Sequence, residues 1–282
     1  MSDLRLVSRE NKKHNSVVQV GSETIGGKEL CMIAGPCAVE SEQQLGEIAK
    51  GISDLGIKFV RAGAYKPRTS PYAFQGLKKE GLKLLRGVAD KYDVKIVTEV
   101  LDTTLIEEVC PYADILQVGS RNAKNYQFLK ELGKIDKPIL LKRGMSSTVN
   151  EWLLAAEYIL LGGNENVILC ERGIRTFDTS VRNTMDIAAI PLAKELSHLP
   201  VIADPSQGTG KRSLVTPMSL ASIAAGADGL MIEVHNEPEE ALSDGFQSMY
   251  LDSMKEMVET LRSQAELSGR TLNLQQSIKE LV

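Results

Sequence analysis

The sequence predicts an α/β barrel of eight parallel strands, each followed by a helix. From about residue 30 onward, short β-branched runs alternate with longer amphipathic stretches. Nearly every strand-like run is apolar in its first half and ends in polar, often ionisable, residues. In a parallel barrel all these ends meet at one face, where function resides. We therefore expect a (β/α)8 barrel, the TIM-barrel architecture, with its site at the carboxyl ends of the strands.

The elements follow in chain order. The predicted strands are CMIAGP at 31–36, KFVRAG at 58–63, VKIVTEV at 94–100, DILQVGS at 114–120, PILLKRG at 138–144, NVILCERG at 166–173, PVIADPS at 200–206 and GLMIEVH at 229–235. The predicted helices lie near 42–54, 71–91, 103–110, 125–133, 148–161, 182–196, 216–225 and 250–268. Ser41, Asp102 and Ser147 are cap-like residues at the start of three of them.

A doubly wound sheet of eight strands would show the same alternation of strands and helices. The residues at the strand ends distinguish that fold from a barrel. That fold usually carries a G-x-G-x-x-G turn after its first strand, and the GPCAVE segment here lacks one. Polar residues end seven of the strands, instead of gathering at one crevice: Arg61, Glu99, Arg121, Lys142, Arg143, Glu171, Arg172, Asp204, Glu233 and His235. This distribution favours the barrel.

Short segments flank the predicted barrel. VVQVGSETIGG at 17–27 alternates in polarity and ends in glycines, which predicts a β-hairpin that plugs the amino-terminal mouth of the barrel. We divide the chain into an extension at 1–29, a catalytic barrel at 30–269 and a tail at 270–282.

Composition excludes several classes of function. The 282 residues include 33 Lys+Arg and 37 Asp+Glu, a net charge of −4, which argues against a nucleic-acid binder. A stretch of about 20 apolar residues, as a membrane span needs, is missing from the sequence. The 4 cysteines form no C-x-x-C pair and the amino terminus has no apolar signal region, so we expect a cytoplasmic protein.

Six cations fall at or just after predicted strand ends, in a chain that is acidic overall: Arg61, Lys66, Arg68, Arg121, Lys142 and Arg172. Any one of them could be an ordinary surface residue. Six at equivalent positions favour a pocket for a substrate with several anionic groups, because arginine binds phosphate and carboxylate bidentately and lysine adds a compact charge.

A second set combines thiol, imidazole and carboxylate groups: Cys37, Glu233, His235 and Asp244, with Asp204 and Gln207 nearby. Such groups at one face can bind Mn, Fe, Co or Zn. They come from distant strands without a compact motif, however, and a lone cysteine such as Cys37 is more often a buried structural thiol.

Taken together, these segments resemble a known family. IAGPCAVES, FVRAGAYKPRTSPYAFQG, ILLKRGM, VILCERGIRTFD, DPSQGTGKRS and IEVHNEPEEALSDG are similar, in order and over about residues 17–268, to 3-deoxy-D-arabino-heptulosonate-7-phosphate (DAHP) synthases of the type I-beta group. The related 3-deoxy-D-manno-octulosonate-8-phosphate synthases carry a KANRSS-like loop where this chain has KPRTS at 66–70. The resemblance therefore favours the four-carbon acceptor erythrose 4-phosphate over arabinose 5-phosphate.

The resemblance implies a transferase that condenses phosphoenolpyruvate with erythrose 4-phosphate, the first step of the shikimate pathway to the aromatic amino acids. It assigns phosphoenolpyruvate to Arg61, Lys66, Arg121, Lys142 and Arg172, with Glu99 beside them. It assigns the sugar phosphate to Arg68 and Thr69. Among these residues Lys66, Glu99 and Lys142 are candidate catalytic residues. Lys66 would be the acid at the aldehyde, and Glu99 would act in the addition of water with a water that is bound to the metal or activated by a lysine.

The resemblance also implies a divalent metal, acting as a Lewis acid, on Cys37, Glu233, Asp244 and position 207. The family reads DPSHGTG where this chain reads DPSQGTG, so Gln207 stands in place of a histidine ligand. A neutral amide is a poorer ligand and cannot titrate near neutral pH. Gln207 is then an engineered change, a natural variant with altered or absent metal dependence, or the mark of a paralogue with another acceptor or none.

Three further points stay open from the sequence. One is whether His235 replaces the lost ligand; another is whether the barrel only binds phosphoenolpyruvate without turnover. Retention of the cations with Cys37, Glu233 and Asp244 favours a working enzyme.

The third is assembly, for which the family implies a homo-oligomer, tetramer or dimer. About 30 residues before the first barrel strand are too few for a regulatory domain, so feedback control would need a separate protein.

Overall fold

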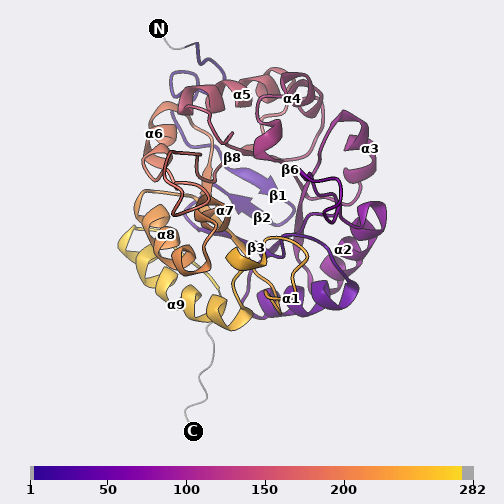
Figure 1. The fold of residues 1–282 in the computed structure, drawn as a ribbon. Helices are drawn as coiled ribbons and strands as arrows, with labels where there is room; N and C mark the ends of the chain where they lie inside the picture. Colours follow the sequence, from indigo (N-terminus) through magenta and orange to yellow (C-terminus); the bar gives the residue numbers. More distant parts are fainter. Residues whose placement is uncertain (1–2, 275–282) are drawn as a thin grey trace.

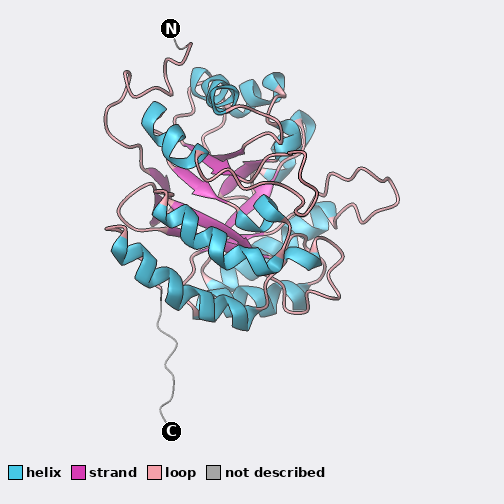
Figure 2. Cartoon of the chain, turned by 60° about the vertical axis from the view of Figure 1, so that its left-hand side comes forward, coloured by secondary structure: helices cyan, strands magenta, loops and turns pink. Residues whose placement is uncertain are grey.

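The structure is a computed structural model, and it describes residues 3–274. Within that range, eight parallel strands close into a barrel in the order β10-β3-β4-β5-β6-β7-β8-β9. They are β3 Cys31–Gly35, β4 Phe59–Arg61, β5 Lys95–Glu99, β6 Ile115–Val118, β7 Ile139–Lys142, β8 Val167–Glu171, β9 Val201–Ala203 and β10 Gly229–Glu233. Helices surround this barrel on its outside (Figures 1 and 2). The predicted (β/α)8 barrel is confirmed.

The helices are α1 Glu42–Asp54, α2 Lys78–Tyr92, α3 Ile106–Val109, α4 Tyr126–Leu132, α5 Val149–Leu161, α6 Ala189–Leu196, α7 Pro205–Thr209, α8 Arg212–Ala224 and α9 Leu251–Leu267. Capping explains where several begin: the Ser41 side chain accepts from Gln44 N, and Thr148 with Glu151 forms a capping box on α5. Their apolar faces pack on the outside of the strands, as Leu45 and Ile48 of α1 do in one core with Met32 and Val60.

Two predicted helices begin too early. The helix predicted at 71–91 starts at Lys78, because Pro71 and the left-handed Gly76, with φ of +87°, hold residues 70–77 in a loop. The helix predicted at 182–196 starts at Ala189, because Thr184 pairs in antiparallel fashion with Ile174. Both loops follow strand ends and extend over the carboxyl-terminal face of the barrel.

The short helix α7 was expected as part of a strand end. Asp204 caps it by accepting from Gln207 N, and Pro205 occupies its first turn. Because α7 starts directly after β9, it places Gln207 beside the end of the barrel axis and not out on a loop.

An antiparallel hairpin, β1 Val18–Val20 and β2 Glu23–Ile25, lies across one end of the barrel (Figure 1). Val18, Val20 and Ile25 form one buried cluster with inward-facing barrel residues such as Ile33 and Phe59. These partners lie in the lower layers of the strands. The hairpin therefore plugs the amino-terminal mouth, as predicted.

Residues 3–16 are tied to the same end. The buried Glu157 of α5 accepts backbone N–H groups from Arg5 at 2.6 Å, Leu6 at 3.2 Å and Val7 at 3.0 Å. His198, just before β9, contacts Ser16 Oγ through Nδ1 at 2.8 Å and Leu6 O through Nε2 at 2.8 Å. These contacts hold the amino-terminal segment against α5 and the loop before β9. The residues of the predicted tail after 274 lie outside the described part of the chain.

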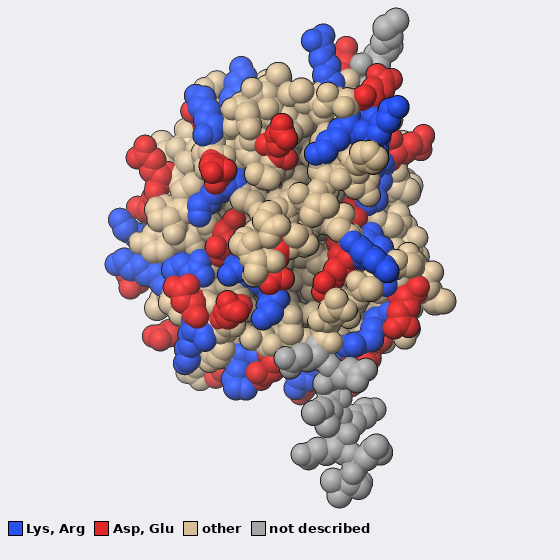
Figure 3. All heavy atoms as spheres, turned by 180° about the vertical axis from the view of Figure 1, so that it is seen from behind, with Lys and Arg blue, Asp and Glu red and all other residues tan. Residues whose placement is uncertain are grey.

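Charges of both signs are interleaved on the face seen from behind in Figure 3, where among the described residues the cations form no broad patch of the kind that binds nucleic acid. A search of residues 3–274 finds no helix of the length and apolarity required to cross a membrane.

Candidate active site

A cavity of about 150 Å³ opens at the carboxyl-terminal end of the barrel. It gathers side chains from most of the strand ends and the loops after them. Its lining comprises Arg61, Lys66, Pro67, Arg68, Glu99, Gln117, Gly119, Ser120, Arg121, Lys142, Met145, Arg172, Arg175, Arg182, Asn183, Gln207 and Asp244. All six predicted cations meet here, so in this acidic protein positive charge is concentrated in one concave site.

The deepest cations are buried against carboxylates. Lys142 Nζ lies 2.5 Å from Asp204 Oδ2, and Arg61 Nη1 lies 3.0 Å from Glu233 Oε1. Burial lowers the pKa of Arg172. Burial acts in the same direction on Arg61, but Glu233 together with Cys37 and Asp204 outweighs it, so the pKa of Arg61 is raised. The Arg61 Nε atom is buried and has no hydrogen-bond partner among the described residues. The pairs fix the cations in place while leaving donors for an anionic ligand.

The loop after β4 forms one rim of the cavity. Arg68 donates through Nε to Phe74 O at 3.2 Å and through Nη2 to Leu242 O at 3.3 Å. It thus joins this loop to the one after β10. Thr69, the other residue predicted to bind the sugar phosphate, is exposed and stands outside the described lining of the cavity.

Glu99, the last residue of β5, also lines the cavity. Gln117 Nε2 approaches its Oε2 at 3.5 Å. Gly119 allows this placement, because a Cβ at position 119 would overlap the Glu99 carboxylate. The neighbouring Ser120 Oγ is buried with no partner among the described residues. Glu99 is therefore a carboxylate held close to several cations without a direct ion pair to them among the described residues.

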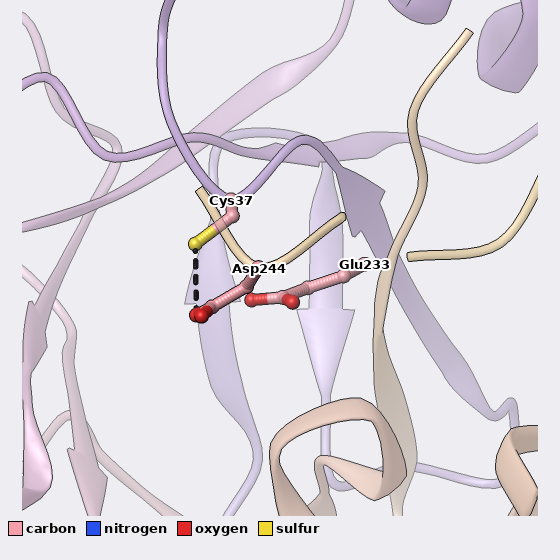
Figure 4. Close-up of side chains that lie close together, drawn as sticks. All are labelled: Cys37, Glu233 and Asp244. Atoms are coloured by element: carbon pink, nitrogen blue, oxygen red, sulfur yellow. Dashed lines mark hydrogen bonds between the residues drawn. The ribbon is translucent and has the colours of Figure 1, made fainter. Parts of the chain in front are cut away.

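Cys37, Glu233 and Asp244 meet beside this cavity, with one potential ligand atom from each lying within 4.8 Å of the others. Figure 4 shows the Cys37 sulfur directed at the Asp244 carboxylate, with Glu233 next to them. Burial raises the pKa of the Cys37 thiol, and Glu233 adds to the rise. Burial alone would raise the pKa of Asp244 too, but Arg182 and Lys66 outweigh it, so the pKa lies below its usual value. By donor type, these three residues suit a borderline divalent metal.

Gln207 occupies the fourth corner of this cluster. Its Nε2 lies 3.0 Å from Glu233 Oε1 and 3.4 Å from Asp244 Oδ2. Its Oε1 accepts from Arg172 Nη2 at 3.0 Å. The atom that faces the cluster is thus an amide N–H donor, which has no lone pair to offer a metal.

His235 does not join the cluster among the described residues. Its Nδ1 accepts from Glu237 N at 3.0 Å, and its Nε2 lies 3.0 Å from Gln44 Nε2 and 3.4 Å from Glu40 Oε2. Nδ1 is therefore engaged by the loop after β10 and Nε2 by residues at the start of α1, and the idea that His235 replaces the missing ligand finds no support in this geometry.

Residues 10–268 match the model of the DAHP synthetase I family, well over half of the chain. The chain belongs to this family. It is 50% identical over 269 residues to the phospho-2-dehydro-3-deoxyheptonate aldolase of Thermotoga maritima, covering 95% of this chain and 80% of that protein. It is 32% identical over 256 residues to a 2-dehydro-3-deoxyphosphooctonate aldolase of Francisella tularensis, covering 85% of this chain and 93% of that protein.

Solved structures give the same relationship. The crystal structure of the Thermotoga maritima DAHP synthase superposes with a TM-score of 0.94 at 49% identity, covering 97% of this chain and 80% of that one. A truncated form of the Thermotoga maritima enzyme superposes with a TM-score of 0.89 at 47% identity, covering 95% of this chain and 98% of that one. The resemblance noted in the sequence is confirmed, and DAHP synthetases of this family generally use a divalent metal.

Several residues of this DAHP synthetase site were missed from the sequence. Arg175, Arg182 and Asn183 reach the cavity from the long loop after β8, and Arg182 Nη1 lies 3.2 Å from Asp244 Oδ1. Gln247 Nε2 donates to Glu233 Oε2 at 2.6 Å from the loop after β10. The available signal was the basic GIRT segment at 173–176, which directly continues the strand-end motif.

A buried ion cluster supports the cavity from outside. Arg143 Nη1 contacts Glu171 Oε2 at 2.9 Å and Asp186 Oδ2 at 2.8 Å, and its Nε donates to Ser147 O at 2.9 Å. Because Arg143 follows Lys142 and Glu171 precedes Arg172, this cluster orients two cavity cations through their neighbours in the chain.

Proposed function

We propose that this chain condenses phosphoenolpyruvate with erythrose 4-phosphate to give DAHP and inorganic phosphate, as a transferase at the entry to the shikimate pathway. The observation that carries the proposal is the convergence of Arg61, Lys66, Arg121, Lys142 and Arg172 with Glu99 in one cavity. Membership of the DAHP synthetase I family and 50% identity to a phospho-2-dehydro-3-deoxyheptonate aldolase support it.

Phosphoenolpyruvate would bind deep in the cavity. Its phosphate and carboxylate need several donors: Lys142 and Arg172 supply buried positive charge, and the exposed Arg121 adds a third cation to the lining. The erythrose 4-phosphate group would bind at the rim, where Arg68 lies, with Thr69 beside it. Two anionic reactants that repel one another in water are thereby held in contact.

In the reaction, C3 of phosphoenolpyruvate attacks the aldehyde carbon and a new C–C bond forms. The aldehyde oxygen takes a proton, and Lys66 is the proposed donor because its Nζ lies at the junction of the cavity and the Cys37 cluster, 3.0 Å from Cys37 Sγ. Water then adds to C2, assisted by Glu99 or Lys142, and phosphate leaves as the C2–O bond breaks. The charges that hold phosphoenolpyruvate also stabilise the departing phosphate.

The metal that the family implies fits this chain poorly. Cys37, Glu233 and Asp244 are suitable donors, but Gln207 turns an N–H toward them and Arg172 holds its carbonyl oxygen away. None of the proposed steps depends on a metal.

The substrate assignment is tested by phosphate release. The purified chain is given phosphoenolpyruvate with erythrose 4-phosphate, with arabinose 5-phosphate, or with no sugar. We expect release with erythrose 4-phosphate at a kcat/KM at least about tenfold above that with arabinose 5-phosphate, a difference of about 1.4 kcal/mol in transition-state binding. Preference for the five-carbon sugar would overturn the acceptor assignment. Binding of phosphoenolpyruvate without release under any condition would indicate a non-catalytic barrel.

Location and assembly are part of the same proposal. Cys31, Cys37, Cys110 and Cys170 are free thiols, which suits a reducing cytoplasm. We also propose a homo-oligomer, tetramer or dimer, with a separate regulatory protein as the source of feedback control. Light scattering of the purified chain tests the oligomeric state.

A further inference from the structure

The orientation of the Gln207 amide is set by its neighbours. A guanidinium carries donors and no acceptor, so only the amide oxygen of Gln207 can bond Arg172 Nη2, at 3.0 Å. On the other side Glu233 Oε1 and Asp244 Oδ2 are acceptors, so only Nε2 can face them, at 3.0 Å and 3.4 Å. Turning the amide over would set its NH₂ against the guanidinium and its oxygen against two carboxylates, and would lose all three bonds.

The backbone of Gln207 is fixed as well. Its N–H donates to Asp204 Oδ1 at 2.9 Å, and its carbonyl accepts from Asn183 Nδ2 at 2.9 Å. These two bonds hold the backbone of residue 207 at the start of α7, and the bonds to Arg172, Glu233 and Asp244 hold the side-chain amide. A donor stays at the fourth corner of the cluster.

The other potential ligands already have protein partners. Glu233 Oε1 accepts from Arg61 and Oε2 from Gln247. Asp244 Oδ1 accepts from Arg182, at 3.2 Å. Cys37 Sγ lies 3.0 Å from Lys66 Nζ. Each carboxylate oxygen thus has a donor, and three cations surround two carboxylates and a thiol.

We propose that this pocket works without a bound divalent metal, with the Gln207 N–H and the Lys66 ammonium group completing the Cys37–Glu233–Asp244 cluster in its place. The proposal rests on the condensation proposed above, and it sets this chain apart from the general metal use of its family. The positive group next to the reacting aldehyde is then Lys66, which both attracts the developing oxygen charge and donates its proton.

Metal binding is tested directly with Co²⁺, whose bond to a thiolate gives a visible absorption band. The full chain is stripped with a chelator and titrated with Co²⁺, beside Gln207→His. We expect the parent chain to show no cobalt–thiolate band, and Gln207→His to bind one equivalent at least about a hundredfold more tightly, because imidazole supplies the lone pair that Nε2 lacks.

Two further variants identify the site. Cys37→Ser in the Gln207→His background should abolish the band. Gln117→His, which adds an imidazole in the same cavity beside Glu99 and away from the cluster, should not create one. A stoichiometric cobalt–thiolate band in the parent chain would overturn the proposal, whether or not the variants fold.

Enzyme activity provides a second, independent test of the metal-free proposal. Phosphate release by the parent chain should stay within about twofold after chelation and after addition of Mn²⁺, Co²⁺ or Zn²⁺. Loss of release on chelation and its recovery with a metal would overturn the metal-free proposal while upholding the condensation. Absence of release under all conditions would instead count against the proposed function, and the cobalt titration would still decide whether the cluster takes a metal.

Discussion

At its amino-terminal end the barrel is filled by Val18, Val20 and Ile25 of the hairpin, which pack on Ile33 and Phe59. At its carboxyl-terminal end the strands finish in Arg61, Lys142, Arg172 and their buried carboxylate partners around an open cavity. One end thus gains stability from apolar burial, at roughly 25 cal/mol per Å². The other buries charges, which contributes little to stability and leaves donors for a ligand.

This contrast predicts that substitutions at the two ends separate in their effects. Changes at the carboxyl-terminal end should reduce activity more than stability, and changes at the amino-terminal end the reverse. Three experiments test this separation, from the largest expected effect to the smallest.

Lys66→Met should have the largest effect. It removes the proposed proton donor, which lies 3.0 Å from Cys37 Sγ, but keeps an unbranched side chain that is one atom shorter. We expect kcat/KM for phosphate release to fall by about 10²–10⁴-fold, with a small change in melting temperature. Lys83→Met is the matched control, because Lys83 forms an exposed pair with Glu80 on α2 and should keep full activity. If kcat/KM of Lys66→Met stayed within tenfold of that of the parent chain, Lys66 would not be the proton donor.

Ile25→Ala should act on stability. Ile25 is fully buried in the plug, so its truncation should lower the free energy of unfolding by about 2–5 kcal/mol. Urea unfolding measures the loss, and phosphate release well below the transition should be unchanged. Val17→Ala, at a position 52% exposed, should cost less than about 0.5 kcal/mol. If Ile25→Ala reduced kcat/KM of the folded protein tenfold, the two ends would not be separable.

The smallest effect is a pH dependence at the amino-terminal end. Burial lowers the pKa of His198 below its usual value of 6.5, so the unfolded chain binds a proton here more readily than the folded one. The stabilisation from neutral His198 is complete above pH 6.5 and is lost as the pH falls from there through the folded pKa. We expect protonation of His198 to lower the free energy of unfolding by about 1 kcal/mol at most.

Thermal unfolding between pH 7.5 and pH 5 checks this, with His198→Gln expected to show a smaller dependence on pH than the parent chain. His14→Gln is the control, since His14 is exposed. If the melting temperature depended on pH equally in all three proteins, His198 would not hold the amino-terminal segment in a pH-dependent way.

The barrel and its cations could be predicted because both depend on local patterns. An apolar run that ends in Arg61, Lys142 or Arg172 predicts a strand, and its charged end predicts which end of that strand faces the site. Loop residues such as Arg182 and Gln247 could not be found this way, because their positions depend on tertiary contacts with Asp244 and Glu233. The orientation of the Gln207 amide likewise follows from Arg172, 35 positions away in the chain.

The reactivity of the buried thiols inside the barrel depends on how often the protein opens. Cys31 and Cys170 are buried in the cluster beneath the hairpin, and burial raises the pKa of each thiol far above its usual value. Alkylating reagents attack the thiolate, so these positions become reactive only when the protein opens. Cys110 on the outer layer is half-buried; burial raises the pKa of its thiol as well, but we expect it to react faster than the buried pair because it keeps contact with solvent. The rate at which an alkylating reagent modifies the buried cysteines, followed by mass spectrometry, therefore reports how often the barrel opens, with no engineered probe in the chain.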